Sequence, residues 1–291
     1  MKNWIKIVSP YLYVLPALAM VTIFLLWPAL DTGFISFTSY NLLTPPRFIG
    51  ISNYIRLFED PFILNSFLNT LWWTILTIIL SVGLGLLFAV GVNRLKFAGF
   101  FKFVFYIPLT LSAVVIGVLW VWIYQSNGLV NTILNEIGLG GWSQTWLLNV
   151  PINTFCMIIA WVWATAGQNM VLFLIGLQTL PTEVIEAADL DGANAWQRFW
   201  HVTFPLLTPM TTVAVTMSLI NSLNQFNIIY VMTGGGPYRS SETLAVSMYR
   251  ESFTMMKFGY GAAIAVVLTI IVFVTSWIYM RHNFKRERDV Y

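Results

Sequence analysis

Charged side chains that could take part in recognition gather in the segment 178–206. Its acidic residues are Glu183, Glu186, Asp189 and Asp191, and its one basic residue is Arg198. Carboxylates pair with Lys or Arg, and a partly desolvated pair that loses one partner typically costs about 2–5 kcal/mol. The segment could therefore dock onto a basic surface of another protein, or it could simply be a helical hairpin between two apolar stretches.

The same segment has the residue pattern of two short helices. The residues that define the pattern are Pro181, Thr182, Ala187, Ala188, Gly192 and Pro205. We predict one helix over 183–191, capped at its start by the threonine hydroxyl and ended by the glycine. A second helix over 193–201 is predicted to stop before the proline. The two alanines are small enough for the first helix to pack closely against another surface.

Neutral polar and aromatic side chains interrupt two of the apolar stretches at helical spacing. They are Trp161, Thr165 and Gln168 in the first stretch and Asn221, Ser222, Asn224 and Gln225 in the second. The first three share one helix face, and Asn221 and Gln225, four residues apart, share another. Such groups suit a sugar, whose rings stack on aromatics and whose hydroxyls both donate and accept hydrogen bonds. The alternative is that they only bond neighbouring helices, as most intramembrane amides do.

Glycines and a proline mark a backbone bend after the second of these stretches. They are Gly234, Gly235, Gly236 and Pro237. Three glycines before a proline favour a turn over a continued helix. The run therefore ends the helix, and it begins the loop 232–258.

The composition decides which kind of elements must position these residues. Of the 291 residues 58% are hydrophobic and 9% are charged, with a mean hydropathy of +0.74. An average soluble domain has about 25% charged residues, so a water-soluble protein is excluded. The single Cys156 excludes an internal disulfide, and no CxxC pattern or His/Cys cluster indicates a metal site.

Apolar stretches of about 20 residues predict membrane-spanning helices, because backbone groups in lipid must be satisfied within the segment. We assign them to 10–30, 69–92, 103–124, 153–177, 207–231 and 259–280. The expected fold is an all-α integral membrane protein with six transmembrane helices.

The distribution of Lys and Arg predicts the orientation. An even number of spans puts both termini on one side, and that side holds ten of the 15 Lys and Arg residues. By the positive-inside rule both termini are cytoplasmic. We divide the chain into an N-terminal helix with an external segment (1–68), a five-helix core (69–281) that includes 178–206, and a basic cytoplasmic tail (282–291).

The run from Glu186 to Pro205 resembles the EAA loop of binding-protein-dependent ABC importers. Glu186-Ala187-Ala188 is followed after three residues by Gly192, and after nine more by Val202-Thr203-Phe204-Pro205. The family pattern ends in Ile, any residue, Leu and Pro, so the chain departs from it by two conservative changes. The runs 50–58, 176–199, 226–237 and 259–263 resemble carbohydrate-importing permeases of the MalF/UgpA type, which have the MetI-like fold of type I importers.

This resemblance implies a permease subunit of an ATP-driven sugar importer, working by alternating access in a bacterial or archaeal cytoplasmic membrane. The alternative cargo is glycerol phosphate or a glycoside derivative. In this family a second permease (MalG-like) completes the path, an ATPase dimer uses ATP and Mg²⁺, and an extracytoplasmic binding protein delivers the solute. The residues implied in coupling to the ATPase are Glu186, Ala187, Ala188, Asp191, Gly192 and Pro205. The turn 234–237 would face the binding protein.

Other functions find less support in the sequence. The chain has no GxxxxGK[ST] loop, so we expect neither ATP hydrolysis nor a bound cofactor in this chain. No nucleic-acid partner is expected. A secondary transporter often uses embedded Asp, Glu or His, and the six predicted spans contain none of these. A membrane enzyme would need an embedded acid–base pair or an activated nucleophile, which the spans also lack.

Overall fold

The computed structural model describes residues 13–93 and 95–290, with side chains described up to residue 281. Lys2, Lys6, Arg94 and the side chains of the predicted basic tail lie outside the described residues. The described residues form helices joined by turns, and their one β-type contact is an isolated bridge between Thr38 and Phe48. The predicted all-α class is confirmed.

Four described helices are long and apolar enough to cross a membrane, and two bent helix pairs bring the number to six if each pair counts as one span. The four are Tyr13–Ile35, Pro61–Val92, Ile152–Gln178 and Phe258–Arg281. The bent pairs are Ala98–Thr110 with Ala113–Ile123, at 101°, and Ala195–Leu206 with Thr208–Leu223, at 69°. All six predicted segments therefore fall on apolar helices.

The helices follow one another along the chain with short connections. The α-helices are α2 (Trp27–Ile35), α3 (Ser52–Glu59), α4 (Pro61–Thr77), α5 (Gly83–Val92), α6 (Ala98–Tyr106), α7 (Ala113–Ile123), α8 (Leu129–Glu136), α9 (Ile152–Gln178), α10 (Thr182–Leu190), α11 (Ala195–Arg198), α12 (Phe204–Leu206), α13 (Thr208–Leu223), α14 (Asn227–Met232), α15 (Leu244–Tyr249) and α16 (Phe258–Val290). Turns of π-helix occupy Thr22–Leu26, Ile78–Val82, Phe199–Thr203 and Arg250–Thr254. Turns of 3₁₀-helix occupy Ile107–Thr110 and Gly140–Trp142.

The chain forms two compact units. The first joins Met1–Asp60 to Ser247–Thr269, and the second joins Pro61–Val246 to Ile270–Tyr291. In the first unit the amide of Asn53 donates to the carbonyls of Ser36 (2.8 Å) and Thr38 (2.9 Å). The backbone N–H of Gly259 donates to the carbonyl of Tyr40 at 3.0 Å. This unit is therefore closed by residues from two segments that lie far apart in the sequence.

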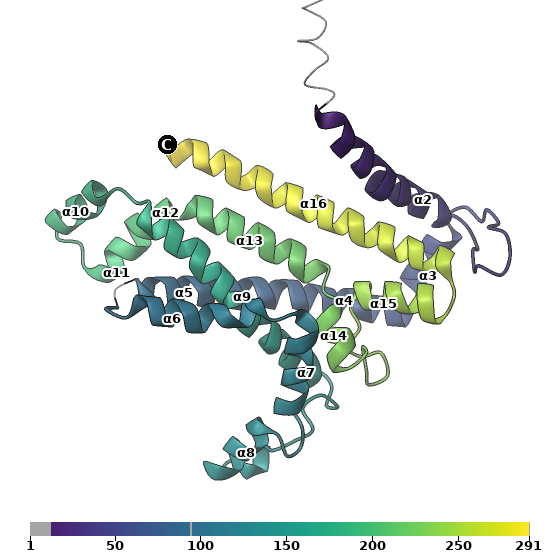
Figure 1. Cartoon of the computed structure of the whole chain (residues 1–291), viewed down its shortest axis with the longest axis horizontal. Coiled ribbons are helices and arrows are strands. Elements are labelled where there is room, and N and C mark those ends of the chain that lie inside the picture. The colour runs from purple at the N-terminus through teal and green to yellow at the C-terminus, as the bar shows by residue number, and fades with distance from the viewer. Residues whose placement is uncertain (1–12, 94, 291) are drawn as a thin grey trace, which may run out of the picture. The chain divides into compact units, whose positions relative to one another are not determined.

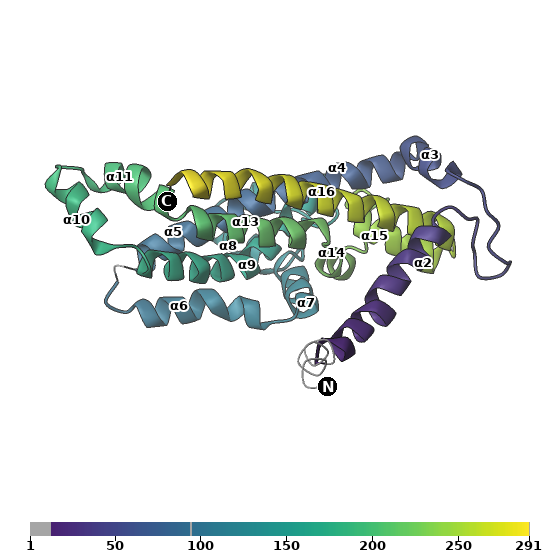
Figure 2. The same cartoon turned by 90° about the horizontal axis from the view of Figure 1, so that it is seen from above.

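The second unit is a bundle of long helices. Within it α5 packs on α9, α4 packs on α13, and α14 packs on α7. A Cβ atom on Gly85 of α5 would lie only 2.9 Å from the backbone carbonyl carbon of Asn169 on α9, so this crossing requires glycine. In both views α10 and α11 extend from one end of α9 (Figures 1 and 2). The bundle thus carries a separate helical hairpin at one end.

The third predicted span is not one continuous helix. We expected a helix over 103–124, whereas α6 and α7 meet at a bend of 101°. Pro108 lies in the 3₁₀ turn before the bend, where its missing N–H removes a helix hydrogen bond. Ser112 then starts α7 by accepting from the N–H of Val115 at 3.3 Å.

The fifth predicted span, 207–231, is also broken. The helix α13 ends at Leu223, and α14 begins at Asn227 after a short irregular connection. The connection is held by buried polar contacts, since the hydroxyl of Thr243 donates to the carbonyl of Gln225 at 2.9 Å. The prediction that Asn221 and Gln225 share a helix face is therefore wrong.

Other predicted boundaries shift by a few residues. The described first helix continues to Ile35, past the predicted end at residue 30. The second span begins at Pro61 instead of residue 69, so the predicted division of the chain at residue 68 falls inside α4, eight residues after the unit boundary at Asp60. The fourth span, predicted over 153–177, is confirmed as α9.

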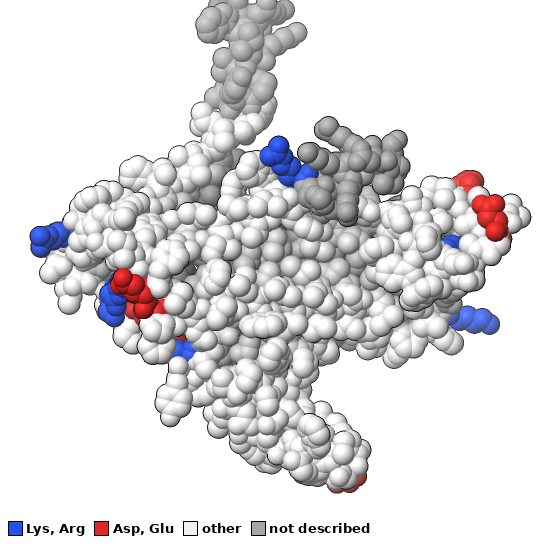
Figure 3. Space-filling view, turned by 180° about the vertical axis from the view of Figure 1, so that it is seen from behind, with Lys and Arg blue, Asp and Glu red and all other residues white. Residues whose placement is uncertain are grey.

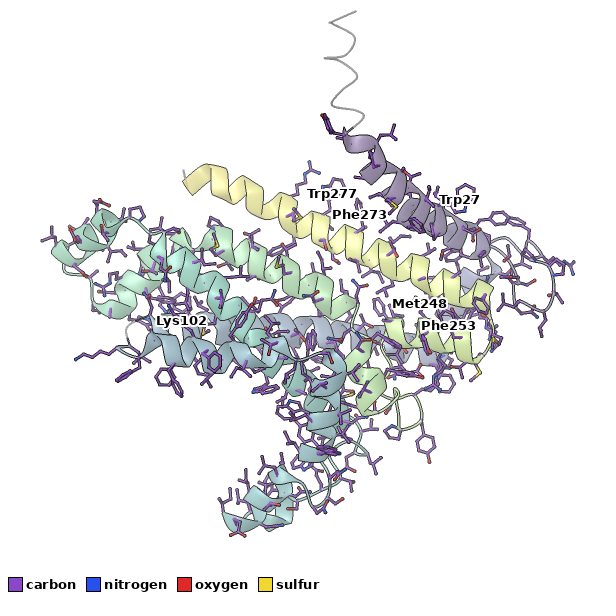
Figure 4. All side chains as sticks on the ribbon, in the orientation of Figure 1. Trp27, Lys102, Met248, Phe253, Phe273 and Trp277 are labelled. Carbon is purple, nitrogen blue, oxygen red and sulfur yellow. The ribbon has the colours of Figure 1, made fainter. Side chains whose placement is uncertain are left out.

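The surface over the long helices is largely uncharged, as Figure 3 shows. Large apolar side chains lie on it. Trp27 on α2, and Phe273 and Trp277 on α16, are each more than half exposed, and Figure 4 marks their positions. Such an apolar exterior is what lipid or another membrane subunit would cover.

Candidate functional site

The hairpin formed by α10 and α11 carries the acidic residues singled out in the sequence. Glu186 and Asp191 are exposed, and acidic side chains gather over this end of the molecule, at the right of Figure 3. Ala187 is exposed and Ala188 is half-buried. The hairpin therefore presents its carboxylates outward, next to small side chains.

The turn of the hairpin requires glycine and is closed by an ion pair. Gly192 has φ +80°, in the left-handed region that residues with a Cβ atom rarely adopt. Across this turn Arg198 of α11 forms a salt bridge with Asp189 of α10. Asn194 and Gln197 form a capping box at the start of α11. These local contacts fix the two helices relative to each other.

Two details of the predicted hairpin are wrong. The N-cap of α10 is Pro181 and no side chain caps it, because Thr182 is already inside the helix. The second helical stretch does not stop before Pro205 but continues through it to Leu206. A π-helical turn over Phe199–Thr203 precedes the proline, and such a change of hydrogen-bond register accommodates a residue that lacks an N–H.

A cavity of about 170 Å³ separates part of the hairpin from the bundle. Its walls come from the ends of α5 and α9, from α10, and from the stretch that begins at α11. They are formed by Val90, Asn93, Leu177, Leu180, Ile185, Ala195, Arg198, Phe199 and Thr203. The hairpin is therefore not close-packed against the long helices on this side.

The polar residues of α9 meet those of α13 at a second, much smaller cavity. Trp161, Thr165, Gln168 and Asn221 all line it, as the sequence pattern led us to expect. The eight described residues around it are uncharged, the others being Thr77, Asn169, Met217 and Ser218. Its volume of about 10 Å³ is room for about one water molecule. A sugar could enter only after the helices separate.

The remaining predicted path residues do not line this cavity. The hydroxyl of Ser222 is buried and donates to the carbonyl of Leu219 at 3.0 Å. Asn224 is exposed and donates to the carbonyl of Ile220 at 2.9 Å. Gln225 is buried beyond the end of α13. The structure thus brings together four of the seven predicted residues.

A buried polar network under the cavity was not predicted. Ser81, in the π-helical turn of the second span, is 2.9 Å from the hydroxyl of Thr165 and accepts from the amide of Asn169 at 2.8 Å. The same amide lies 3.4 Å from the hydroxyl of Ser218. The network ties three spans together. The sequence feature that could have indicated this network is the presence of Ser and Thr residues in the second span. We considered the amide and aromatic side chains of the spans and did not consider these hydroxyl groups.

The glycine-rich run forms a tight loop whose tip is an aromatic residue. Gly234 and Gly235 have φ of +60° and +86°, and Pro237 follows Gly236. Tyr238, next in sequence, is 96% exposed. The turn predicted at this place is confirmed, and the aromatic side chain of Tyr238 projects from its surface.

Three asparagines from distant helices hold this loop. Asn65 and Asn69, four residues apart on α4, both donate to the carbonyl of Ser240, at 3.1 and 2.7 Å. Asn153 on α9 donates to the carbonyl of Gly236 at 3.0 Å. These hydrogen bonds from side-chain amides to loop carbonyls restrict the backbone of the loop, so the loop is rigid. The spacing of Asn65 and Asn69 was the available sequence signal.

A buried ion pair lies in the same loop. The Nη2 atom of Arg239 is 2.9 Å from Oε2 of Glu242, whose side chain is fully buried. The guanidinium group also lies over the ring of Phe62, 4.6 Å from its centre. Burying a carboxylate without a partner is costly, so this pair is a strong constraint on the loop's conformation.

Within the described part of the chain, no group of three or more His, Cys, Asp or Glu residues could hold a metal ion. The candidate sites are therefore an acidic hairpin at one end of the bundle, a small neutral polar cavity among the long helices, and a rigid loop with an exposed aromatic tip.

Comparison with known proteins identifies the family to which this chain belongs. The family described as binding-protein-dependent transport system inner membrane component matches residues 81–288. The chain is 34% identical over 289 residues to the arabinooligosaccharides transport system permease protein AraP of Bacillus subtilis, covering 97% of this chain and 91% of that protein. It is 31% identical over 283 residues to the sn-glycerol-3-phosphate transport system permease protein UgpA of Agrobacterium fabrum, covering 96% of each.

A solved structure with the same fold is that of a bacterial ABC transporter involved in the import of the acidic polysaccharide alginate. The TM-score is 0.85 at 22% sequence identity, over 98% of this chain and 99% of that chain. At this identity the likeness concerns the fold.

Proposed function

The chain belongs to the family of binding-protein-dependent transport system inner membrane components, and we propose that it is the permease subunit of an ATP-driven importer for a sugar. The observation that carries the choice of cargo is the cavity between α9 and α13. Its lining combines an indole ring with hydroxyl and amide groups and has no charged side chain. Such a surface can stack on a sugar ring and exchange hydrogen bonds with its hydroxyls.

The hairpin of α10 and α11 is the contact with the ATPase in this proposal. The exposed carboxylate of Glu186 would pair with a basic residue of the ATPase, and the small side chains beside it would allow close docking. ATP and Mg²⁺ would act in that partner and not in this chain. In this proposal the hairpin lies on the cytoplasmic side of the membrane, and with an even number of spans both ends of the chain would lie there too.

Transport would proceed by alternating access. The cavity holds about one water molecule in the described conformation, so the path must open for a sugar to pass. A second, different permease would supply the other wall of the path. Movement of the hairpin by the ATPase would provide the opening, and the 170 Å³ cavity behind the hairpin leaves room for such movement.

The rigid loop around Tyr238 would receive the extracytoplasmic binding protein. Aromatic anchors held in one conformation bind with a small loss of conformational entropy. The three asparagine contacts and the buried ion pair supply that rigidity here.

The test begins with a mild detergent purification of the tagged chain from its own cells. Mass spectrometry should find a second permease, an ATPase and a binding protein with it. The reconstituted complex should take up solute only when ATP is supplied. Solute movement through the purified chain alone, without ATP, would contradict the proposal and favour a secondary transporter.

The cargo is then decided with the binding protein. We would measure its binding of radiolabelled pentose and hexose oligosaccharides and of glycerol 3-phosphate. A neutral oligosaccharide is the expected ligand, because the described cavity lining offers no cation for a phosphate. Tight binding of glycerol 3-phosphate alone would move the chain to the alternative cargo of the same importer class.

A further inference from the structure

The hydroxyl-bearing residues of α4 differ in how their hydroxyl groups are bonded. Ser66, Thr70 and Thr74 each donate to the backbone carbonyl four residues earlier, at 2.8, 2.7 and 2.8 Å. Thr77, the last residue of α4, does not follow them, and its Oγ1 has no hydrogen-bond partner among the described residues. Threonine in a helix ordinarily bonds to a carbonyl of the preceding turn, so Thr77 has a free hydroxyl where its neighbours have none.

Thr77 lines the small cavity between α9 and α13 and is only 1% exposed. The indole Nε1 of Trp161, which lines the same cavity, is also buried and has no partner within the described part of the chain. Buried polar groups are nearly always hydrogen-bonded. Two such groups on one cavity therefore indicate that the cavity suits a polar occupant of the size of a water molecule or a hydroxyl group.

The other buried polar side chains on this cavity, those of Thr165, Asn169 and Ser218, already have hydrogen-bond partners. Thr165 donates to the carbonyl of Trp161 at 3.0 Å and contacts Ser81, while the amide of Asn169 donates to Ser81. These bonds hold the cavity floor in place. Thr77 and Trp161 are left with unused bonding capacity, together with Gln168, whose amide has only a weak contact with the sulfur of Met217 at 4.0 Å.

The chemistry of these groups defines the group they would bind. The indole N–H only donates, so its partner must be an acceptor, and the threonine hydroxyl both donates and accepts. A sugar hydroxyl satisfies both at once. The cavity volume of about 10 Å³ fits a single hydroxyl group, with the ring outside it.

We propose that Thr77, from the second span, is a specificity-determining residue that binds one hydroxyl group of the transported sugar together with Trp161. This inference rests on the proposed function and adds a third helix to the two whose polar faces define the path. A site built to bond a hydroxyl rejects an analogue that lacks it, because the buried groups are then left unpaired.

The test compares Thr77→Val with Thr74→Val in the reconstituted complex. Both changes remove a hydroxyl from α4 and keep the side-chain shape, but the Thr74 hydroxyl is already bonded to its own helix. The probes are the tritiated sugar retained by the binding protein and its mono-deoxy analogues. Thr77→Val should lower ATP-dependent uptake of the parent sugar about tenfold, whereas Thr74→Val and Thr77→Ser should stay close to wild type.

One mono-deoxy analogue should distinguish a binding role from a structural one. It should be transported equally by the wild type and by Thr77→Val, because its missing hydroxyl is the one that Thr77 binds. Wild-type uptake of the parent sugar by Thr77→Val, or an equal loss for the parent and every analogue, would overturn the inference. A wild-type complex that takes up no sugar with ATP would instead refute the proposed function itself, before Thr77 is tested.

Discussion

Asp189 at the end of α10 and Arg198 at the end of α11 form an ion pair across the turn at Gly192. Half of the Asp189 side chain is exposed, and ion pairs at such positions contribute about 1 kcal/mol or less to stability. The pair therefore acts on the angle between the two helices more than on the folding of the chain.

We predict that Asp189→Asn and Arg198→Gln each lower ATP-driven uptake by about twofold to fivefold while the protein remains in the membrane. The double exchange Asp189→Arg with Arg198→Asp should recover much of the loss, because it restores an attractive pair. The measurement is solute moved per ATP hydrolysed in proteoliposomes. If the double exchange transports as little solute per ATP as the single variants, this ion pair does not set the angle between α10 and α11.

Glu186→Lys should abolish transport and leave the permease in the membrane. The change puts a positive charge where a basic residue of the ATPase is expected, and losing a partly desolvated pair costs about 2–5 kcal/mol, or thirtyfold and more in affinity. Glu183→Lys, on the same helix and also exposed, is the control. Co-purification of the ATPase reports the contact directly, and full transport by Glu186→Lys would remove this residue from coupling.

Asn221→Leu should reduce uptake about tenfold, because a hydroxyl of the sugar would lose a hydrogen-bond partner at the cavity that Asn221 lines. Asn224→Leu is the matched control, since Asn224 is on the same stretch and equally exposed but does not line the cavity and is bonded to its own helix. Uptake kinetics and the yield of assembled complex are measured for both. Equal kinetics in the two variants would mean that Asn221 has no part in the path.

Glu242→Gln should destabilise the loop around Tyr238 by about 3 kcal/mol, because removing one partner leaves the other charge uncompensated in a buried site. Its expected consequences are a lower melting temperature and weaker stimulation of ATP hydrolysis by the binding protein. Glu136→Gln, an exposed acid of α8, should change neither. A variant at Glu242 that melts and responds like wild type would show that the pair does not hold the loop.

The parts of this molecule that depend on local sequence were predictable from it. The span α9 follows from its apolar length, and the turn at Gly192 follows from a glycine that ends a helix pattern. The breaks near Ser112 and Asn224 were not predicted, because both stretches were assigned as spans from their length and their lack of charge. Pro108 marked the first, whereas the second depends on contacts with Thr243, eighteen residues further along.

The site was predictable only where one helix carries its residues. Trp161, Thr165 and Gln168 share a face of α9 and do line one cavity. Thr77 was missed because its importance comes from an unused hydroxyl, which only the packing of three helices shows. The spacing of Asn65 and Asn69 places both amides on one face of α4, but their contacts with Ser240 span more than 170 residues, so the sequence did not indicate what they bind.

The division of the first unit between two distant segments of the sequence has a consequence for how the protein is made. The residues that close this unit, among them Gly259 with its bond to Tyr40, leave the ribosome more than 200 residues after the first helix. At about 5–20 residues per second, synthesis of that stretch takes about 10–40 s. During this time the first helix is in the bilayer without the segment that completes its unit, so a prematurely terminated chain leaves this unit open to degradation even when the central helices are complete.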